Sequence, residues 1–405
     1  MLDKVTAKSA MKTDTTEIIT SMKRFREPPV RPHAGDVAIV GAGLIGLSIA
    51  FELASRGATV RVYDAAEPAH GASWAGAGML APLTETIKDE SLRRLCELSL
   101  RAYPAFAQAV TAASGIDAHL RLDGLIYAAF DSATRDDLLM RAERLQQRGF
   151  PVRTLDHREA IAFEPVLGKR LVGAILMEEE GHVDNRRLGR ALSAACSALG
   201  VAVKAGAGHV RVKHDQRKVL GVTTDDGFFA ADVVINAAGA WAARVEGVPP
   251  DCVPPVFPMK GQMLALALPP ALIRHPIWVP DAYLVPREDG RLLIGATVED
   301  CGFDSRVTAA GIHVLLDAAL KALPVLNDFA ITETWAGLRP ATPDLKPFIG
   351  ATPLERYFLA TGHFRNGILL APVTATLIAD AVEGQEDETL RLFALQRSQP
   401  EHAHV

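Results

Sequence analysis

The first regular pattern in the chain joins a short apolar run at residues 37–40 to a stretch with helical periodicity. The apolar positions of that stretch recur three and four residues apart and would share one helix face: Leu47, Ala50, Phe51 and Ala54. Gly57 ends the pattern, and residues 59–63 then form a second strand-like run. This order predicts a strand, a helix and a strand, which together make one β-α-β unit.

A glycine-rich sequence, Gly41-Ala42-Gly43-Leu44-Ile45-Gly46, lies between the first strand and the helix. In such a loop the first glycine makes a tight turn, the second lets backbone approach a pyrophosphate, and the third lets the helix pack on the sheet. The helix N-terminus then offers N–H groups and partial positive charge to phosphates. Asp64, after the second strand, is placed for a ribose hydroxyl and disfavours NADP. The motif predicts a site for FAD or NAD and does not decide between them.

The rest of the chain alternates between helical and strand patterns, which predicts an α/β fold. Further helices are expected at 135–148, 185–199, 312–323 and 368–382, and further strands at 201–203, 210–212, 231–236 and 357–360. The strand at 231–236 is nearly all apolar, as in a parallel sheet that is buried on both faces. It leads to small residues around Gly239 that would let backbone approach a ligand.

Two Asp-Gly pairs, at 226–227 and 289–290, are hairpin signals. Prolines punctuate short alternating strands between 247 and 340, which predicts an antiparallel sheet inserted into the nucleotide-binding domain. The strand, loop and helix over 357–382 would return the chain to the ligand near its C-terminal end. A long dinucleotide such as FAD could be contacted by segments from both ends of the sequence.

These patterns divide the chain into a discontinuous FAD-binding domain, a substrate-binding domain and an extension. The FAD-binding domain is expected at 34–112, 181–246 and 341–390, and the α+β substrate-binding domain at 113–180 and 247–340. Residues 1–33 are polar and end in a proline-rich run. They are expected to form a flexible N-terminal extension that does not belong to the fold.

Composition narrows the class of protein. A chain of 405 residues fits about two domains, and its net charge of −5, without a block of Lys and Arg, excludes an electrostatic footprint for nucleic acid. The four cysteines form no metal-ligand spacing, and Cys196 falls on an apolar stripe that predicts a buried thiol. The longest apolar run, 37–51, contains three glycines and is shorter than the ~20 residues of a membrane helix. A cytoplasmic protein without an integral membrane segment is therefore expected.

Over about residues 36–385 the chain resembles the glycine oxidases of the thiamine pathway, a branch of the D-amino-acid-oxidase family. The segments that carry the resemblance are Ala72–Leu80, Tyr283–Arg287, Trp335–Pro340 and Gly362–Leu370. The resemblance implies a Rossmann-like FAD-binding domain of the glutathione-reductase type with an inserted antiparallel-sheet domain. It also implies a homotetramer. Because no cysteine lies between Trp335 and Leu370, FAD is expected to be held non-covalently.

The resemblance and the glycine loop together name the expected FAD contacts. The adenosine and pyrophosphate would be met by Gly41, Gly43, Leu44, Ile45, Gly46, Asp64 and Ala65, and the adenine by backbone at His209 and Val210. The flavin would be lined by Ala72, Ser73, Ala77, Gly78, Met79 and Gly239. The loop that would hold the isoalloxazine ring contains His363, Phe364, Arg365, Asn366, Gly367, Ile368 and Leu369.

Three side chains are implied to bind the substrate: Arg339, Arg365 and Tyr283. A buried carboxylate needs a paired cation, and a guanidinium matches it with two hydrogen bonds. Each residue also has a plainer interpretation. Arg339 could form a structural salt bridge, Arg365 could support only the flavin, and Tyr283 could be a core aromatic. His363 could act as a base or make only a loop contact.

The expected reaction is hydride transfer from the α-carbon of a neutral amine to the flavin, with O2 then giving hydrogen peroxide. The imine would hydrolyse or supply thiazole synthesis. Glycine is favoured over sarcosine and small D-amino acids. The positions expected to set the pocket size depart from the family pattern: Ala81, Thr84, Asp281, Ala282, Val298 and Glu299. The alternatives are a D-amino-acid dehydrogenase that reduces a quinone, an NAD-dependent dehydrogenase, and a flavoprotein without turnover.

Overall fold

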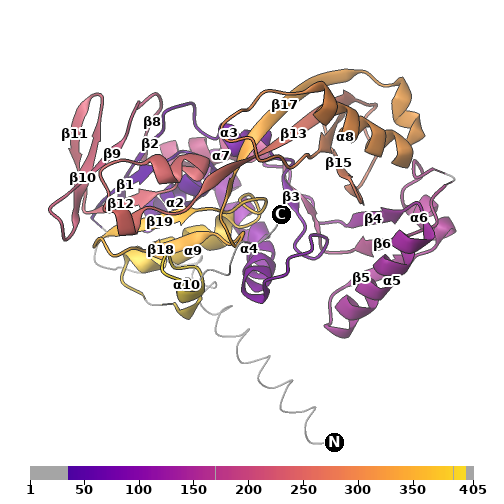
Figure 1. The fold of residues 1–405 in the computed structure, drawn as a ribbon, viewed down its shortest axis with the longest axis horizontal. Helices are drawn as coiled ribbons and strands as arrows, with labels where there is room; N and C mark the ends of the chain where they lie inside the picture. Colours follow the sequence, from indigo (N-terminus) through magenta and orange to yellow (C-terminus); the bar gives the residue numbers. More distant parts are fainter. Residues whose placement is uncertain (1–34, 169, 386, 398–405) are drawn as a thin grey trace, which may run out of the picture.

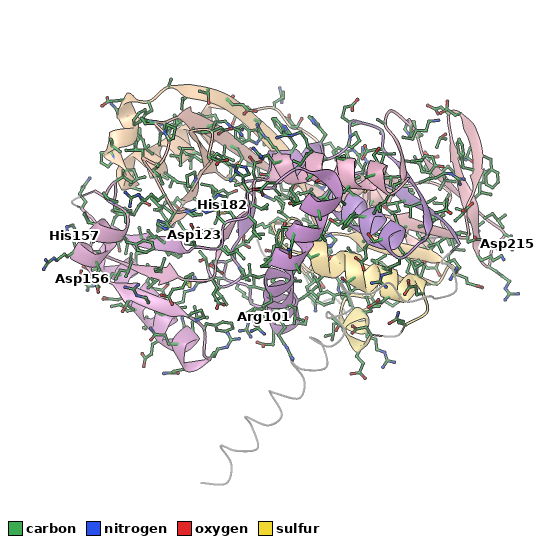
Figure 2. All side chains as sticks on the ribbon, turned by 180° about the vertical axis from the view of Figure 1, so that it is seen from behind. Arg101, Asp123, Asp156, His157, His182 and Asp215 are labelled. Atoms are coloured by element: carbon green, nitrogen blue, oxygen red, sulfur yellow. The ribbon has the colours of Figure 1, made fainter. Side chains whose placement is uncertain are left out.

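Two large sheets organise the chain, and Figure 1 shows them side by side. The computed structural model describes residues 35–168, 170–385 and 387–397, so the predicted extension at 1–33 lies outside the described residues. Figure 2 shows Asp156, at the start of helix α6 (His157–Phe163), and Asp215, in the β9–β10 hairpin, at opposite ends of the molecule. The bounds predicted for the two domains stay a prediction.

The first sheet contains the predicted β-α-β unit. Strand β1 (Asp36–Val40), helix α2 (Leu44–Ser55) and strand β2 (Thr59–Tyr63) follow the predicted order. The six strands lie in the order β18-β19-β12-β1-β2-β8 and run parallel, except that β18 is antiparallel to β19. The remaining four are β8 (Ala202–Lys204), β12 (Val233–Asn236), β18 (Phe348–Ala351) and β19 (Tyr357–Thr361).

The two faces of this sheet are covered differently. Successive side chains of a strand point to opposite faces, so Val37 and Ile39 pack with helices while Ala38 and Val40 pack with a smaller sheet. The helices are α2, α4 (Glu90–Ser114), α7 (Asn185–Ala198) and α9 (Ala371–Val382). The smaller sheet comprises β9 (Arg211–His214), β10 (Val219–Thr224) and β11 (Gly227–Ala230). Covering on both faces explains why β12 is buried throughout and apolar at all its positions except Asn236.

The second sheet has eight strands in the order β17-β13-β16-β15-β14-β4-β6-β5. They are β4 (Leu125–Ala129), β5 (Val152–Leu155), β6 (Gly173–Met177), β13 (Phe257–Ala267), β14 (Ile277–Val279), β15 (Ala282–Pro286), β16 (Arg291–Gly295) and β17 (Ile331–Ala341). All neighbours are antiparallel except β14 and β4, and Asp289-Gly290 joins β15 to β16 as predicted. Helices α8 (Ala309–Ala322) and α6 pack on one face, and α5 (Ser132–Gln147) packs on the other.

A long strand pair, β13 with β17, carries the second sheet toward the first. Helix α3 (Gly71–Ala75) lies directly on β17, where the Trp335 indole N–H donates to the Ala75 carbonyl at 2.9 Å. A β-carbon at Gly337 would lie 2.5 Å from the Ala75 side chain, so this close approach needs glycine. Two short strands, β3 (Met79–Leu80) and β7 (Gly181–His182), pair beside this junction.

Several helices differ from the sequence patterns, and α5 and α8 each begin three residues before the predicted starts at 135 and 312. Helix α9 begins at Ala371, not at Ile368, because an earlier start would put Pro372 inside the helix, where its ring clashes with a carbonyl. The 25-residue helix α4, which contains Pro104, was not predicted. Short helical turns at η2 (Gly239–Arg244), η3 (Pro250–Cys252), η4 (Pro324–Asp328) and α10 (Glu388–Leu392) complete the described fold. Cys196 is buried, as predicted, and no helix within the described ranges is long and apolar enough to cross a membrane.

The contact between the glycine loop and helix α2 is so close that a larger residue at Gly46 should destabilise the protein. A β-carbon at Gly46 would lie 1.9 Å from the Gly41 carbonyl oxygen, whereas one at Gly57 would meet nothing within 4 Å. Gly46→Ala should lower the free energy of unfolding by about 3 kcal/mol through overpacking. Gly57→Ala, the control, should cost only about 1 kcal/mol for its positive φ. Urea unfolding compares the two, and equal losses would contradict the packing argument.

Candidate active site

A cavity of about 360 Å³ lies where the two sheets meet. Segments far apart in the sequence line it: the glycine loop, α3 with the loop after it, strands β13, β15 and β17, and the loop after β19. In a doubly wound sheet a ligand binds outside the carboxyl ends of the strands, which is where the glycine loop and the β19 loop lie.

The glycine loop is held from two sides. Gly41 has a φ of 108°, and a β-carbon there would lie 2.4 Å from the Ala237 carbonyl oxygen. The N–H of Ala42 donates to Asp64 Oδ2 at 2.6 Å, and the N–H of Leu44 donates to Ser73 Oγ at 2.9 Å. The N-cap residue of α2, Gly43, has no side chain to cap the helix, and Ser73 Oγ satisfies only the N–H of its first residue. The start of this helix therefore presents its partial positive charge to whatever lies in front of the loop.

Asp64 joins the loop to the predicted adenosine side. Its second oxygen, Oδ1, accepts from the N–H of Ala66 at 2.8 Å, and its backbone carbonyl accepts from Ala207 at 2.8 Å. A carboxylate has about four acceptor positions, so Asp64 can still accept from a ribose hydroxyl. His209 and Val210 follow Ala207 in the same loop, before β9. The structure thus brings Asp64 near the segment predicted to meet the adenine.

Most of the residues predicted to contact FAD line the cavity. These are Gly43, Leu44, Ile45, Ala72, Ser73, Ala77, Gly78, Met79, Gly239, His363, Phe364, Arg365, Gly367 and Ile368. The residues not in the lining are Gly41, Gly46, Asp64, Ala65, His209, Val210, Asn366 and Leu369. Leu369 packs in the core beside α4, and its carbonyl accepts from Ser99 Oγ at 2.6 Å. Helix α4 therefore supports the β19 loop from behind, a role that sequence patterns did not reveal.

The loop at 76–79 rests on a buried arginine. Arg287 Nη2 donates to the Ala77 carbonyl at 2.7 Å and to Asn185 Oδ1 at 3.0 Å. A β-carbon at Gly78 would lie 1.9 Å from the Val183 carbonyl oxygen. Burial lowers the pKa of the Arg287 guanidinium to about 10. Strand β15 thus places Tyr283 in the cavity lining, and Arg287, which directly follows the strand, lies behind the cavity wall.

Arg339, Arg365 and Tyr283 meet at one end of the cavity, as the resemblance implies. Arg339 Nη1 donates to the Thr297 carbonyl at 3.0 Å, and no described carboxylate lies within salt-bridge distance of it. A β-carbon at Gly261 would lie 2.2 Å from Nη2, so only glycine on β13 leaves room for the guanidinium. Burial lowers the pKa of Arg339, and the charge of Arg365 acts in the same direction. Among the described residues, the structural salt bridge considered for Arg339 is absent.

Three of the six positions expected to set the pocket size do not line the cavity. Ala81 and Thr84 are buried and do not line the cavity, so they are not the pocket wall. Glu85 lines it instead, with Asp281, Ala282 and Val298 from the second sheet. Glu299 is also outside the lining and pairs with Lys260 at 2.8 Å. Glu85 was not predicted, because a single glutamate in a polar stretch forms no recognisable motif.

His363 lines the cavity but is fixed by the helix that follows. Its Nε2 lies 3.1 Å from Thr374 Oγ1 on α9, and the side chain is buried. Burial lowers the pKa of the imidazole to about 3, so it is neutral near pH 7. A neutral ring that is hydrogen-bonded to a helix fits a contact residue of the loop.

Residues 36–381 match the family described as FAD dependent oxidoreductase. The chain belongs to this family. It is 37% identical over 357 residues to a glycine oxidase of Geobacillus kaustophilus, which covers 87% of the chain and 94% of the relative. The crystal structure of glycine oxidase from that organism superposes with a TM-score of 0.85 at 36% identity, covering 90% of this chain and 99% of that one.

Two further comparisons bear on the range of the family. A protein of Trichormus variabilis named bifunctional protein ThiO/ThiG is 37% identical over 369 residues, which are 90% of this chain but 55% of that protein. The chain thus spans about half the length of that relative. The iminodiacetate oxidase of Chelativorans sp. BNC1 superposes with a TM-score of 0.80 at 29% identity, covering 89% of this chain and 98% of that one.

FAD is the cofactor of this oxidoreductase, and the residues of the site fit it. The start of α2, where the N-cap residue Gly43 has no side chain, suits a pyrophosphate, and Asp64 has acceptor capacity for a ribose. At Gly239, on the cavity wall, a β-carbon would meet nothing within 4 Å, so the wall is open there. Non-covalent attachment stays a prediction, although no cysteine occurs among the described lining residues.

A buried histidine beside Arg287 should make the oxidoreductase sensitive to acid. His182, labelled in Figure 2, is 7% exposed, and its pKa is lowered to about 3 by burial and then by the charge of Arg287. This depressed pKa gives stability that is present above about pH 6.5 and lost as the pH falls. In His182→Gln, the free energy of unfolding should fall less steeply between pH 6.5 and 4, by up to about 1.4 kcal/mol per pH unit.

Urea unfolding at several pH values measures this slope. His313→Gln, at an exposed position on α8, is the control and should leave the slope unchanged. Equal slopes for the wild type and His182→Gln would show that His182 does not contribute to acid sensitivity.

Proposed function

We propose that this oxidoreductase oxidises glycine or a closely related small amino acid, with O2 as the final electron acceptor. The observation that carries the proposal is the Arg339 guanidinium, which lines the flavin-side cavity without a carboxylate partner among the described residues. A cation in such a place is complementary to a ligand carboxylate. Relatives named glycine oxidase, at 37% identity over most of both chains, support the same substrate class.

The first task of the site is to hold the substrate carboxylate. The carbonyls of Thr297 and Lys260 accept from Arg339 Nη1 at 3.0 and 3.3 Å, and Gly261 leaves room for the guanidinium, so its Nη2 and Nε groups can bind two carboxylate oxygens in one plane. The Tyr283 hydroxyl interacts with the Arg339 guanidinium and lies 3.5 Å from Met263 Sδ, a weak acceptor, so its proton can be donated to a substrate oxygen. With the carboxylate fixed, the α-carbon has one orientation in the cavity, and such positioning supplies a large share of the rate.

The second task is to present a neutral amine to the flavin. When bound, FAD supplies the hydride acceptor. The protein needs no strong base at the α-carbon, because the amine lone pair drives the loss of hydride. His363 is occupied with Thr374 and serves as a wall of the cavity. The products would be hydrogen peroxide and an imine, which hydrolyses or serves thiazole synthesis, as the resemblance to thiamine-pathway glycine oxidases implies. A homotetramer remains the expectation from that resemblance, and a cytoplasmic location remains the expectation from the sequence composition.

Removal of the Arg339 guanidinium should separate substrate binding from cofactor binding. Arg339→Ala should keep FAD but lose about 3–5 kcal/mol of substrate stabilisation, because the carboxylate would be buried without a partner. Flavin absorbance reports the cofactor, and kcat/KM for glycine reports the loss. Arg339→Lys keeps the charge but loses the planar guanidinium, so its kcat/KM should lie between the values of the wild type and Arg339→Ala. An unchanged kcat/KM in Arg339→Ala would exclude Arg339 from substrate binding.

The electron acceptor can be tested directly. With glycine, the purified holoenzyme should consume O2 and release hydrogen peroxide without an added acceptor, and an oxygen electrode with a peroxide assay measures both. Sarcosine and D-alanine, measured in parallel, establish the substrate preference. A D-amino-acid dehydrogenase would instead stay reduced until an artificial quinone is supplied. Flavin that stays oxidised with every small amine would contradict catalysis of this kind.

A further inference from the structure

The cavity has a negative side as well as a positive one. Glu85 and Asp281 are the two carboxylates among the described lining residues, and they occupy different surroundings. Asp281 is exposed, whereas Glu85 is half-buried within reach of the charges of Arg365 and Arg339. The cavity therefore contains a half-buried carboxyl group within reach of the charges of its two guanidinium groups, and nothing in the carboxylate-binding role of Arg339 accounts for it.

Two side chains hold the turn that carries Glu85 by hydrogen bonds to its backbone. The Glu180 carboxylate, 0% exposed, accepts from the N–H groups of Leu83 and Thr84 and from the Thr84 hydroxyl. From the other side, Arg141 Nη2 donates to the carbonyls of Leu83 and Thr84, the latter at 2.6 Å. Burying a carboxylate is costly unless it is hydrogen-bonded in this way. The side chains of Glu180 and Arg141 thus fix the backbone that directly precedes Glu85.

We propose that Glu85 binds the ammonium group of the incoming amino acid while Arg339 binds its carboxylate. This inference rests on the proposed function and names the form of substrate that the cavity selects, a small zwitterion. A cavity with only Arg339 and Arg365 would attract any small carboxylate and would leave an ammonium group unpaired. Glu85 supplies the complementary charge that separates an amino acid from a simple acid such as acetate.

The same carboxylate can take the proton that the ammonium must lose. The N–H bond of the ammonium breaks, the O–H bond of Glu85 forms, and the amine keeps the electron pair. Burial raises the pKa of Glu85, while Arg365 and Arg339 oppose the rise. Pairing Arg339 with the substrate carboxylate offsets one of these charges and increases the proton affinity of Glu85. The other titratable groups whose charges couple to Glu85 are Tyr283 and Cys96.

Specificity for the amine substituent follows from the same charge. A glycine whose nitrogen carries a second carboxylate, as in iminodiacetate, would bring that anion toward Glu85. A neutral methyl group would meet no such repulsion. The chain should therefore bind iminodiacetate poorly, although an iminodiacetate oxidase shares its fold.

The experiment compares glycine with acetate, which lacks only the amine. Dissociation constants are measured by calorimetry on anaerobically reduced holoenzyme, which cannot turn glycine over. Glu85→Gln should weaken glycine binding about 10- to 100-fold, the range for a lost charge-assisted hydrogen bond, and should leave acetate binding equal or tighter. Iminodiacetate should bind more tightly to Glu85→Gln than to the wild type.

Matched variants separate the proposal from a structural role. Glu85→Asp keeps the charge and should recover part of the preference for glycine over acetate, also if Glu85→Gln fails to retain FAD. Asp281→Asn removes a carboxylate from the same cavity and should change the preference less than about twofold. If glycine and acetate affinities change by the same factor in Glu85→Gln, Glu85 only balances the arginines and the proposal is overturned. Turnover is not needed for this comparison, so a wild type that makes no peroxide would refute the proposed function alone.

Discussion

The site depends on a guanidinium held inside the protein without a carboxylate partner among the described residues. Arg339 is fixed by the Thr297 carbonyl and by the space above Gly261, and its charge is unfavourable there until an anion arrives. The long β13–β17 ladder sets this arrangement, because its register places Met259 opposite Arg339 and Gly261 opposite Gly337. The same ladder brings α3 and the flavin-side loop against the second sheet through Trp335.

Electrostatic balance explains the residues around that guanidinium. Arg339 and Arg365 give the cavity positive charge, and the carboxylate of Glu85 offsets part of this charge. Behind the walls, Arg287 and Glu180 are buried and hydrogen-bonded to backbone groups of the lining loops. Buried charges with these partners hold loops in one conformation, which suits a site that must orient a very small substrate.

Much of the fold follows from local patterns. The glycine loop with its strand–helix–strand order, the apolar strand β12 and the Asp289-Gly290 hairpin all depend on residues within a few positions of one another. Their period and turn chemistry are therefore visible in the sequence. The start of α9 was misplaced by three residues, because an apolar run does not show where Pro372 permits the first turn.

The sequence by itself determined a dinucleotide-binding unit, an inserted antiparallel sheet and, through its resemblance to a family, the arginines and tyrosine expected near the substrate. Only the tertiary structure decided that Glu85 and not Thr84 faces the cavity, that Gly261 makes room for Arg339, and that α4 supports the β19 loop. These contacts join residues far apart in the chain. They have no period and no local turn signal, so packing alone fixes them.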